Sequence, residues 1–158
     1  MEYTEIESVV KAILDNIYIP KINLEISQKL MNMVENEAIK MNISVVTAVA
    51  DEGGNPIAVH CMDNAYIASF DVALNKAFTS VALKMTTRQL KELSVPGGSL
   101  YGVQYTNQGK IVIFGGGVPL IYKDRVIGGL GVSGGSEEQD TYLADYGMRC
   151  LKEVLNCN

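Results

Sequence analysis

His60 is the only histidine of the chain, and it lies two residues before Met62 near the end of a predicted strand. Successive side chains of a strand point to opposite faces, so His60 and Met62 share one face while Cys61 points to the other. Imidazole nitrogen and thioether sulfur are both ligands of haem iron. The spacing therefore indicates a metal-ligating His60 with Met62 and Asp63 beside it. The alternative is a structural histidine whose ring is hydrogen-bonded to its neighbours.

A glycine-rich segment, residues 129–134, matches the G-x-G-x-x-G pattern of dinucleotide-binding turns. A Rossmann unit needs a second parallel strand after the following helix, and the chain ends there instead. Glu137, Glu138 and Asp140 also place negative charge where a pyrophosphate would dock. We therefore expect these glycines to permit close packing at the exit of a strand.

The residues do not form a recognisable catalytic constellation. A serine or cysteine triad would have to recruit His60, whose neighbour Cys61 faces the other way, and no G-x-S-x-G elbow is present. Asp51 and Asp63 lie at a predicted hairpin turn and at its exit, where aspartate usually accepts hydrogen bonds from turn amides. We expect no catalytic residues.

Composition excludes several classes of protein. The 158 residues include 13 Lys and Arg against 18 Asp and Glu, a net charge of −5, which disfavours a nucleic-acid partner. No apolar run reaches the roughly 20 residues of a membrane span, and the N-terminus lacks the basic start of a secretory signal. Cys61, Cys150 and Cys157 show neither disulfide-framework nor zinc-site spacing. We expect one domain with a short appendage, located in the cytoplasm.

The elements that must position these residues follow from periodicity and turn signals. In the first half we expect a helix, a hairpin of two strands and two further helices, over residues 24–41, 43–50, 57–62, 67–84 and 87–93. After a long loop over residues 94–109, we expect three strands and a last helix opened by an S-x-x-Q capping box, over residues 110–114, 118–122, 125–132 and 136–155. Short connections exclude parallel crossovers, so the prediction is an α+β fold with a five-stranded antiparallel sheet.

An amphipathic helix is predicted ahead of this domain. Its apolar stripe follows helical spacing, and Pro20 separates it from the rest; the stripe is Ile6, Val9, Val10, Ile13, Leu14 and Ile17. Residues 1–20 therefore form either an address that a partner groove recognises, or a helix that packs on its own domain or on another copy.

Several motifs stand in an order and at separations that resemble one family. They are Asp51-x-x-Gly54, Met62-Asp63-Asn64-Ala65, Lys76-Ala77-Phe78-Thr79-Ser80, the segment 114–120 and the segment 127–135. Over about residues 24–155 the chain resembles the GlcG/HbpS/PduO C-terminal family (DUF336), a haem-degrading-type domain. The family's usual Arg-Met-Asp-Gly-Ala is here Cys61-Met62-Asp63-Asn64-Ala65, and the helix over residues 24–41 has no histidine.

The resemblance implies a profilin-like three-layer α-β-α domain over residues 21–158 that self-associates. Similar members bind haem, and others occur with vitamin B12-dependent diol metabolism. The expected function is a small accessory protein that binds haem or a related tetrapyrrole, made for a bacterial microcompartment or diol pathway. The helix over residues 1–20 resembles encapsulation peptides, so shell or lumen proteins are expected partners and the microcompartment lumen is a second expected location.

The expected ligand contacts His60, Met62, the loop over residues 94–109 and the glycine turn over residues 115–117. The complete set of expected ligand-binding residues is His60, Met62, Asp63, Tyr101, Lys110, Gly115 and Gly116. Two alternatives stay open: a structural or assembly oligomer without a ligand, and an enzyme acting on an unidentified small metabolite.

Overall fold

The computed structural model describes residues 3–156, apart from the side chains of residues 3–5, 12 and 14–16. The helices are α1 (Tyr3–Ile17), α2 (Leu24–Lys40), α3 (Ser69–Leu83), α4 (Thr87–Leu93) and α5 (Glu137–Asn156), with short 3-10 turns at Val103–Tyr105 and Asn107–Gly109. The strands are β1 (Val46–Asp51), β2 (Pro56–Cys61), β3 (Gly117–Tyr122) and β4 (Arg125–Ser133).

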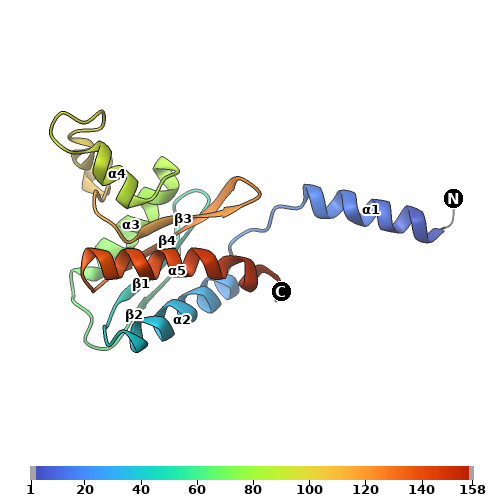
Figure 1. Cartoon of the computed structure of the whole chain (residues 1–158), viewed down its shortest axis with the longest axis horizontal. Helices are drawn as coiled ribbons and strands as arrows, with labels where there is room; N and C mark the ends of the chain where they lie inside the picture. Colours follow the sequence, from blue (N-terminus) through green and yellow to red (C-terminus); the bar gives the residue numbers. More distant parts are fainter. Residues whose placement is uncertain (1–2, 157–158) are drawn as a thin grey trace.

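The domain has three layers around one antiparallel sheet (Figure 1). The four strands follow the order β2-β1-β4-β3, and every neighbouring pair is antiparallel. Helices α2 and α5 cover one face of the sheet and enclose the larger core, while α3 covers the other face over small residues. The predicted α+β class and antiparallel sheet are therefore confirmed.

The fifth predicted strand, residues 110–114, does not form, so that prediction is wrong. Ile111 and Val112 are buried as a strand would be, but their segment pairs with no strand in the described residues. The hydroxyl of Thr79 on α3 accepts a hydrogen bond from the Val112 N–H at 3.0 Å and donates one to the Lys110 carbonyl at 3.2 Å. A helix side chain thus satisfies the backbone groups that a neighbouring strand would otherwise bind.

The glycine-rich strand β4 brings α3 into direct backbone contact with the sheet. A Cβ at Gly129 would lie 2.5 Å from the Ala77 carbonyl oxygen, and a Cβ at Gly131 would overlap the Ala73 carbonyl. Both alanines belong to α3, and both are buried. The glycines of the G-x-G-x-x-G match therefore permit close packing, as the sequence indicated.

Side-chain caps set the starts of three helices. Ser136 and Gln139 form the predicted capping box at the start of α5, with the Ser136 N–H bonded to Gln139 Oε1 at 2.8 Å and the Gln139 N–H to Ser136 Oγ at 3.3 Å. At α4 the cap is Thr86 with Gln89, so the helix begins at Thr87, as predicted. Asn23 caps α2 by accepting from the Ile26 N–H at 2.8 Å.

Helix α1 projects away from the three layers, on the side of the turn between β3 and β4 (Figure 1). The described members of its apolar stripe are all exposed, namely Ile6, Val9, Val10, Ile13 and Ile17; the side chain of Leu14 lies outside the described residues. Pro20 and Ile22 are buried, so the chain rejoins the domain directly after Tyr18 and Ile19. Among residues 3–156, none of the helices combines the length and the apolar character that a membrane crossing requires.

Because α3 and β4 are in direct backbone contact, we expect one added methyl group at this contact to destabilise the fold strongly. Gly131→Ala should lower the free energy of unfolding by about 3 kcal/mol, because overpacking a core that cannot relax costs this much. Chemical denaturation measures the change. Gly97→Ala is the control: no atom lies within 4 Å of the added Cβ, and a backbone φ of +85° is the only penalty, about 1 kcal/mol. Equal losses in the two variants would contradict the packing argument.

Candidate functional site

His60 is held by a carboxylate from the opposing helix. It lies in β2 directly opposite Thr47 of β1, so both side chains point to the face that α2 covers. Glu35 of α2 reaches between them: its Oε1 lies 2.8 Å from His60 Nδ1 and accepts a hydrogen bond from Thr47 Oγ1 at 3.0 Å. The His60 side chain is 30% exposed. The carboxylate fixes the ring with Nδ1 toward the protein and leaves Nε2 on the other side.

Met62 and Asp63 line a shallow hollow beside this cluster. The hollow has a volume of about 520 Å³ and is lined by Asn32, Glu35, Asn36, Ile39, Met62 and Asp63. Met62 packs against the large core, and its Sδ accepts a hydrogen bond from the Val45 N–H at 3.4 Å. The sulfur that was expected to face a ligand therefore helps hold the end of β2 to β1. Asp63 is exposed at the rim.

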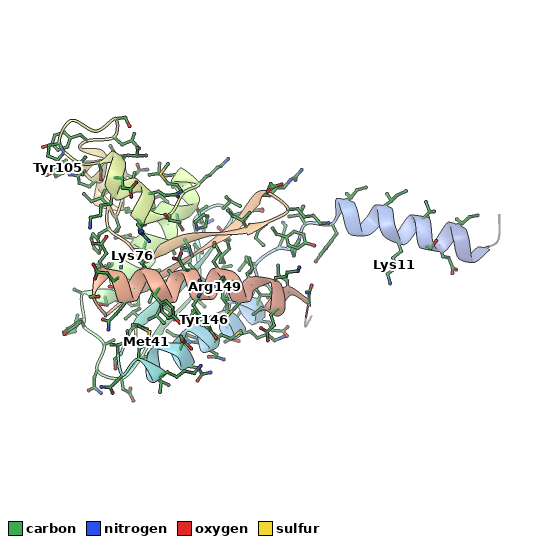
Figure 2. All side chains as sticks on the ribbon, in the orientation of Figure 1. Lys11, Met41, Lys76, Tyr105, Tyr146 and Arg149 are labelled. Carbon is green, nitrogen blue, oxygen red and sulfur yellow. The ribbon has the colours of Figure 1, made fainter. Side chains whose placement is uncertain are left out.

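The other predicted ligand-binding residues lie elsewhere in the fold. Tyr101 is 65% exposed in the loop over residues 94–109, whose tip carries Tyr105 at the end of the molecule opposite Lys11 (Figure 2). Lys110 places its Nζ 5.8 Å above the Phe78 ring of α3. Gly115 donates its N–H to Glu137 Oε1 at 3.0 Å, and the Gly116 carbonyl accepts from the Val132 N–H at 2.8 Å.

Within one chain, His60 lies far from the predicted ligand-binding residues Lys110, Gly115 and Gly116. His60 lies on β2, and Gly115 and Gly116 precede β3, which is the opposite edge of the sheet. Three strand spacings separate these edges, roughly 14 Å. Lys110 sits over α3, on the face that His60 does not share. Ligand contact by any of these residues stays a prediction, and a ligand touching both groups would need a second copy of the chain.

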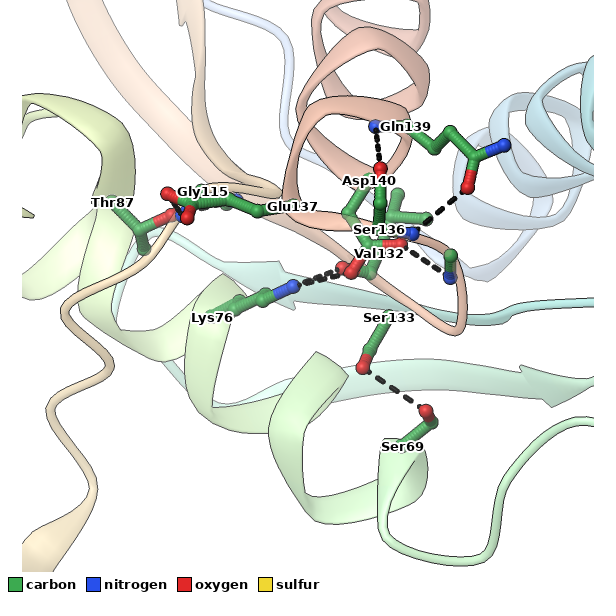
Figure 3. Close-up of polar contacts among 12 residues, drawn as sticks. Ser69, Lys76, Thr87, Gly115, Val132, Ser133, Ser136, Glu137, Gln139 and Asp140 are labelled. Carbon is green, nitrogen blue, oxygen red and sulfur yellow. Dashed lines mark hydrogen bonds and ion pairs between the residues drawn. The ribbon is translucent and has the colours of Figure 1, made fainter.

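A buried ion pair, whose members are not among the predicted site residues, lies next to the glycine turn over residues 115–117 (Figure 3). Lys76 of α3 has no exposed surface, and its Nζ donates at 2.8 Å both to Asp140 Oδ2 and to the Val132 carbonyl. The same ammonium lies 5.0 Å from the centre of the Phe114 ring. Gly116, with a backbone φ of +108°, must be a glycine here, because a Cβ would lie 2.6 Å from Nζ.

Burial dominates the electrostatics of this pair. It lowers the pKa of the Lys76 ammonium and raises the pKa of the Asp140 carboxyl, because each charge has lost its hydration. The opposite charge of the partner works against both shifts. Asp140 also accepts the Gly135 N–H at 2.9 Å, so its carboxylate occupies the amides at the start of α5.

Glu137 holds the same turn from its outer side. Its carboxylate accepts from Lys91 Nζ at 2.6 Å and from the Gly115 N–H, and these bonds lower the pKa of Glu137. Lys76 belongs to one of the motifs that resemble the family, and most of its neighbours in the predicted helix are small or apolar. A lysine in such a setting is a sequence signal for a buried lysine. Its partner lies 64 positions away and could not be identified from spacing.

Metal ligation would have to rest on few residues. Within the part of the chain that the structure describes, no three His, Cys, Asp or Glu side chains cluster as a metal site. The thiols of Cys61 and Cys150 are free, and Cys157 lies outside the described residues. Metal ligation by His60 therefore stays a prediction.

Comparison with known proteins places this geometry in a family. Residues 22–149 match the family model described as haem degrading protein HbpS-like. The chain is similar to an uncharacterized 15.0 kDa protein in the dhaT-dhaS intergenic region of Citrobacter freundii, 45% identical over 86% of this chain and 96% of that protein. It is also 40% identical to corrinoid adenosyltransferase PduO of Citrobacter freundii, over 72% of this chain but only 34% of that enzyme. A solved structure, the PduOC:heme complex, is 35% identical with a TM-score of 0.79, covering 82% of this chain and 94% of that one.

The buried pair predicts a strong coupling between its two members. Lys76→Met should lower the free energy of unfolding by about 4 kcal/mol, because it leaves a buried carboxylate without its counter-charge. Adding Asp140→Asn removes that charge and keeps an acceptor for the Gly135 N–H, so the double variant should regain about 2 kcal/mol. Urea denaturation of the four proteins measures the cycle. Purely additive losses would show that the pair is not coupled.

Proposed function

The chain belongs to the HbpS-like family, and on that premise we propose that it is a small accessory protein that binds haem or a related tetrapyrrole through His60. The 35% identical PduOC:heme complex supports the choice of ligand class. The observation that carries the proposal is the 2.8 Å contact between His60 Nδ1 and Glu35. Metal-binding histidines typically donate their second ring nitrogen to a carboxylate in this way.

The residues around His60 would hold its ring ready to bind the iron of a haem. Glu35 orients the ring through Nδ1, and Thr47 in turn fixes the carboxylate. Haem, when bound, supplies a redox-active iron and an absorbance that reports its ligands. The protein's own residues hold the imidazole in one orientation and one tautomer, which lowers the entropic cost of binding.

Self-association is a further part of the proposed function. His60 does not line the hollow beside it, and the predicted contacts Gly115 and Gly116 lie at the opposite edge of the sheet, so we expect a second copy to cover a bound tetrapyrrole. The exposed stripe of α1 supports a second part of the proposal, in which residues 1–20 recognise a microcompartment shell or lumen protein as a helix in a groove. The similarity to PduO supports a role beside corrinoid-dependent metabolism.

Haem titration tests the ligand. We expect a Soret band on haem addition, and a change in its position in His60→Ala, because the axial ligand is lost. Glu35→Gln should keep the band but make the reduction potential more positive, since an amide is a weaker acceptor and the imidazole becomes a poorer donor to the iron. Cys61→Ser, adjacent in β2 but on its other face, is the matched control. Binding no stronger than that of an unrelated acidic protein would refute the proposal.

Deletion and substitution of α1 test the address. Removing residues 1–18 should leave the free energy of unfolding within about 0.5 kcal/mol of the full chain, because the described stripe side chains make no buried contact. A reporter fused to residues 1–20 should co-purify with microcompartment shells, and Val10→Glu with Ile13→Glu should abolish this. A diffuse reporter, or a double variant that fails to fold, would rule out the address.

A further inference from the structure

Two of the sequence motifs meet at a second hollow, which the proposed function does not use. This α3 hollow has a volume of about 330 Å³ and is lined by parts of the segments 114–120 and 127–135 and by the start of α3. Ser133, which lines it, lies directly opposite Val46 of β1, so its side chain points to the face of the sheet that α3 covers. His60 points to the face that α2 covers, so the α3 hollow is separate from the proposed haem contact.

Two buried hydroxyls in the α3 hollow share a single hydrogen bond. Ser69 is 5% exposed and Ser133 7%, and Ser133 Oγ donates to Ser69 Oγ at 3.1 Å (Figure 3). The two hydroxyls carry two protons, and this bond uses one of them. In the part of the chain that the structure describes, neither hydroxyl donates to any other group, so the Ser69 proton is left for an acceptor in the hollow. A buried donor without an acceptor is costly, so it indicates an oxygen atom that the chain itself does not supply.

The charges around the α3 hollow favour a neutral molecule. Glu137 and Asp140 line it, and the described lining residues include no lysine or arginine. The cations that pair with these carboxylates, Lys91 and Lys76, lie outside the lining. A ligand carboxylate would therefore lose hydration beside two like charges, with no cation on the lining to pair with it. A carbonyl or hydroxyl oxygen avoids this cost.

The wall and the volume of the α3 hollow limit the size of the ligand. Tyr66, Ala68, Val72 and Phe114 give it an apolar wall that can pack against a carbon chain. Because one water molecule takes about 30 Å³ of the liquid, a hollow of about 330 Å³ has room for roughly ten non-hydrogen atoms. A tetrapyrrole is far larger than this, so the ligand differs from the one proposed for His60.

We propose that the α3 hollow binds a small neutral organic molecule whose carbonyl or hydroxyl oxygen accepts a hydrogen bond from Ser69 and whose short carbon chain packs on Val72 and Phe114. The proposal goes beyond the haem function and does not depend on it.

Saturation-transfer NMR of the full chain tests the site with two probes of the same shape. Butanone is neutral, and propionate carries a charged oxygen in place of one of its methyl groups. We expect butanone to bind at least about tenfold more tightly than propionate, because a carboxylate in the hollow finds no cation to replace its hydration. Absence of butanone binding would mean that the hollow holds only water, and equal binding of both probes would contradict selection of a neutral ligand. Either result overturns the proposal.

A serine variant tests the predicted hydrogen bond. Ser69→Ala should weaken butanone binding about fivefold, the usual contribution of a neutral hydrogen bond. Ser94→Ala is the matched control, because Ser94 is also 5% exposed but its hydroxyl donates to the Lys91 carbonyl at 3.1 Å. Equal losses in the two variants would contradict the role of Ser69.

Filling the α3 hollow tests its position with both serines in place. Val72→Phe should abolish butanone binding, and urea denaturation checks that this variant is folded. A folded Val72→Phe that still binds butanone would overturn the assignment of the site. His60→Ala should leave butanone binding unchanged, because His60 lies on the other face of the sheet, so failure of the haem proposal and failure of this one are distinguishable.

Discussion

The ion pair between Lys76 and Asp140 is the constraint around which one end of the domain is arranged. It joins α3, the last residues of β4 and the first turn of α5, and its two charges are almost completely out of water. Such burial is costly unless every polar atom finds a partner, and here the carbonyl of Val132 and the amide of Gly135 complete the set. Gly116 follows from the same requirement, because no other residue leaves room for the ammonium.

Regular elements could be predicted because their signals are local. The capping box of Ser136 and Gln139 and the strand predicted over residues 57–62 each rest on signals within a few positions, and both were confirmed. The predicted strand over residues 110–114 failed because its fate depends on Thr79, a side chain 31 to 33 positions earlier that replaces a strand as hydrogen-bonding partner. Nothing in a buried apolar run reveals whether a strand or a helix will satisfy its backbone.

The candidate site shows the same limit. The sequence identified His60, yet gave no reason to select Glu35 from the acids of α2, since only the packing of that helix on the sheet brings the two within 2.8 Å. The predicted site combined His60 on one edge of the sheet with Gly115 and Gly116 beside the other edge, and only the fold shows how far apart these residues lie. The predicted family is confirmed by the match over residues 22–149, whereas the arrangement of the side chains could be seen only in the fold.

The abrupt transition after α1 has a consequence for how the protein persists in a cell. Tyr18 is 65% exposed, while Pro20 and Ile22 are already anchored in the domain. Proteases cut where backbone can leave its fold at little cost, and this junction is such a place. Cleavage there would yield a shorter chain with an intact domain. The ratio of full-length to shortened chains would therefore measure the fraction of the protein that is protected from proteases.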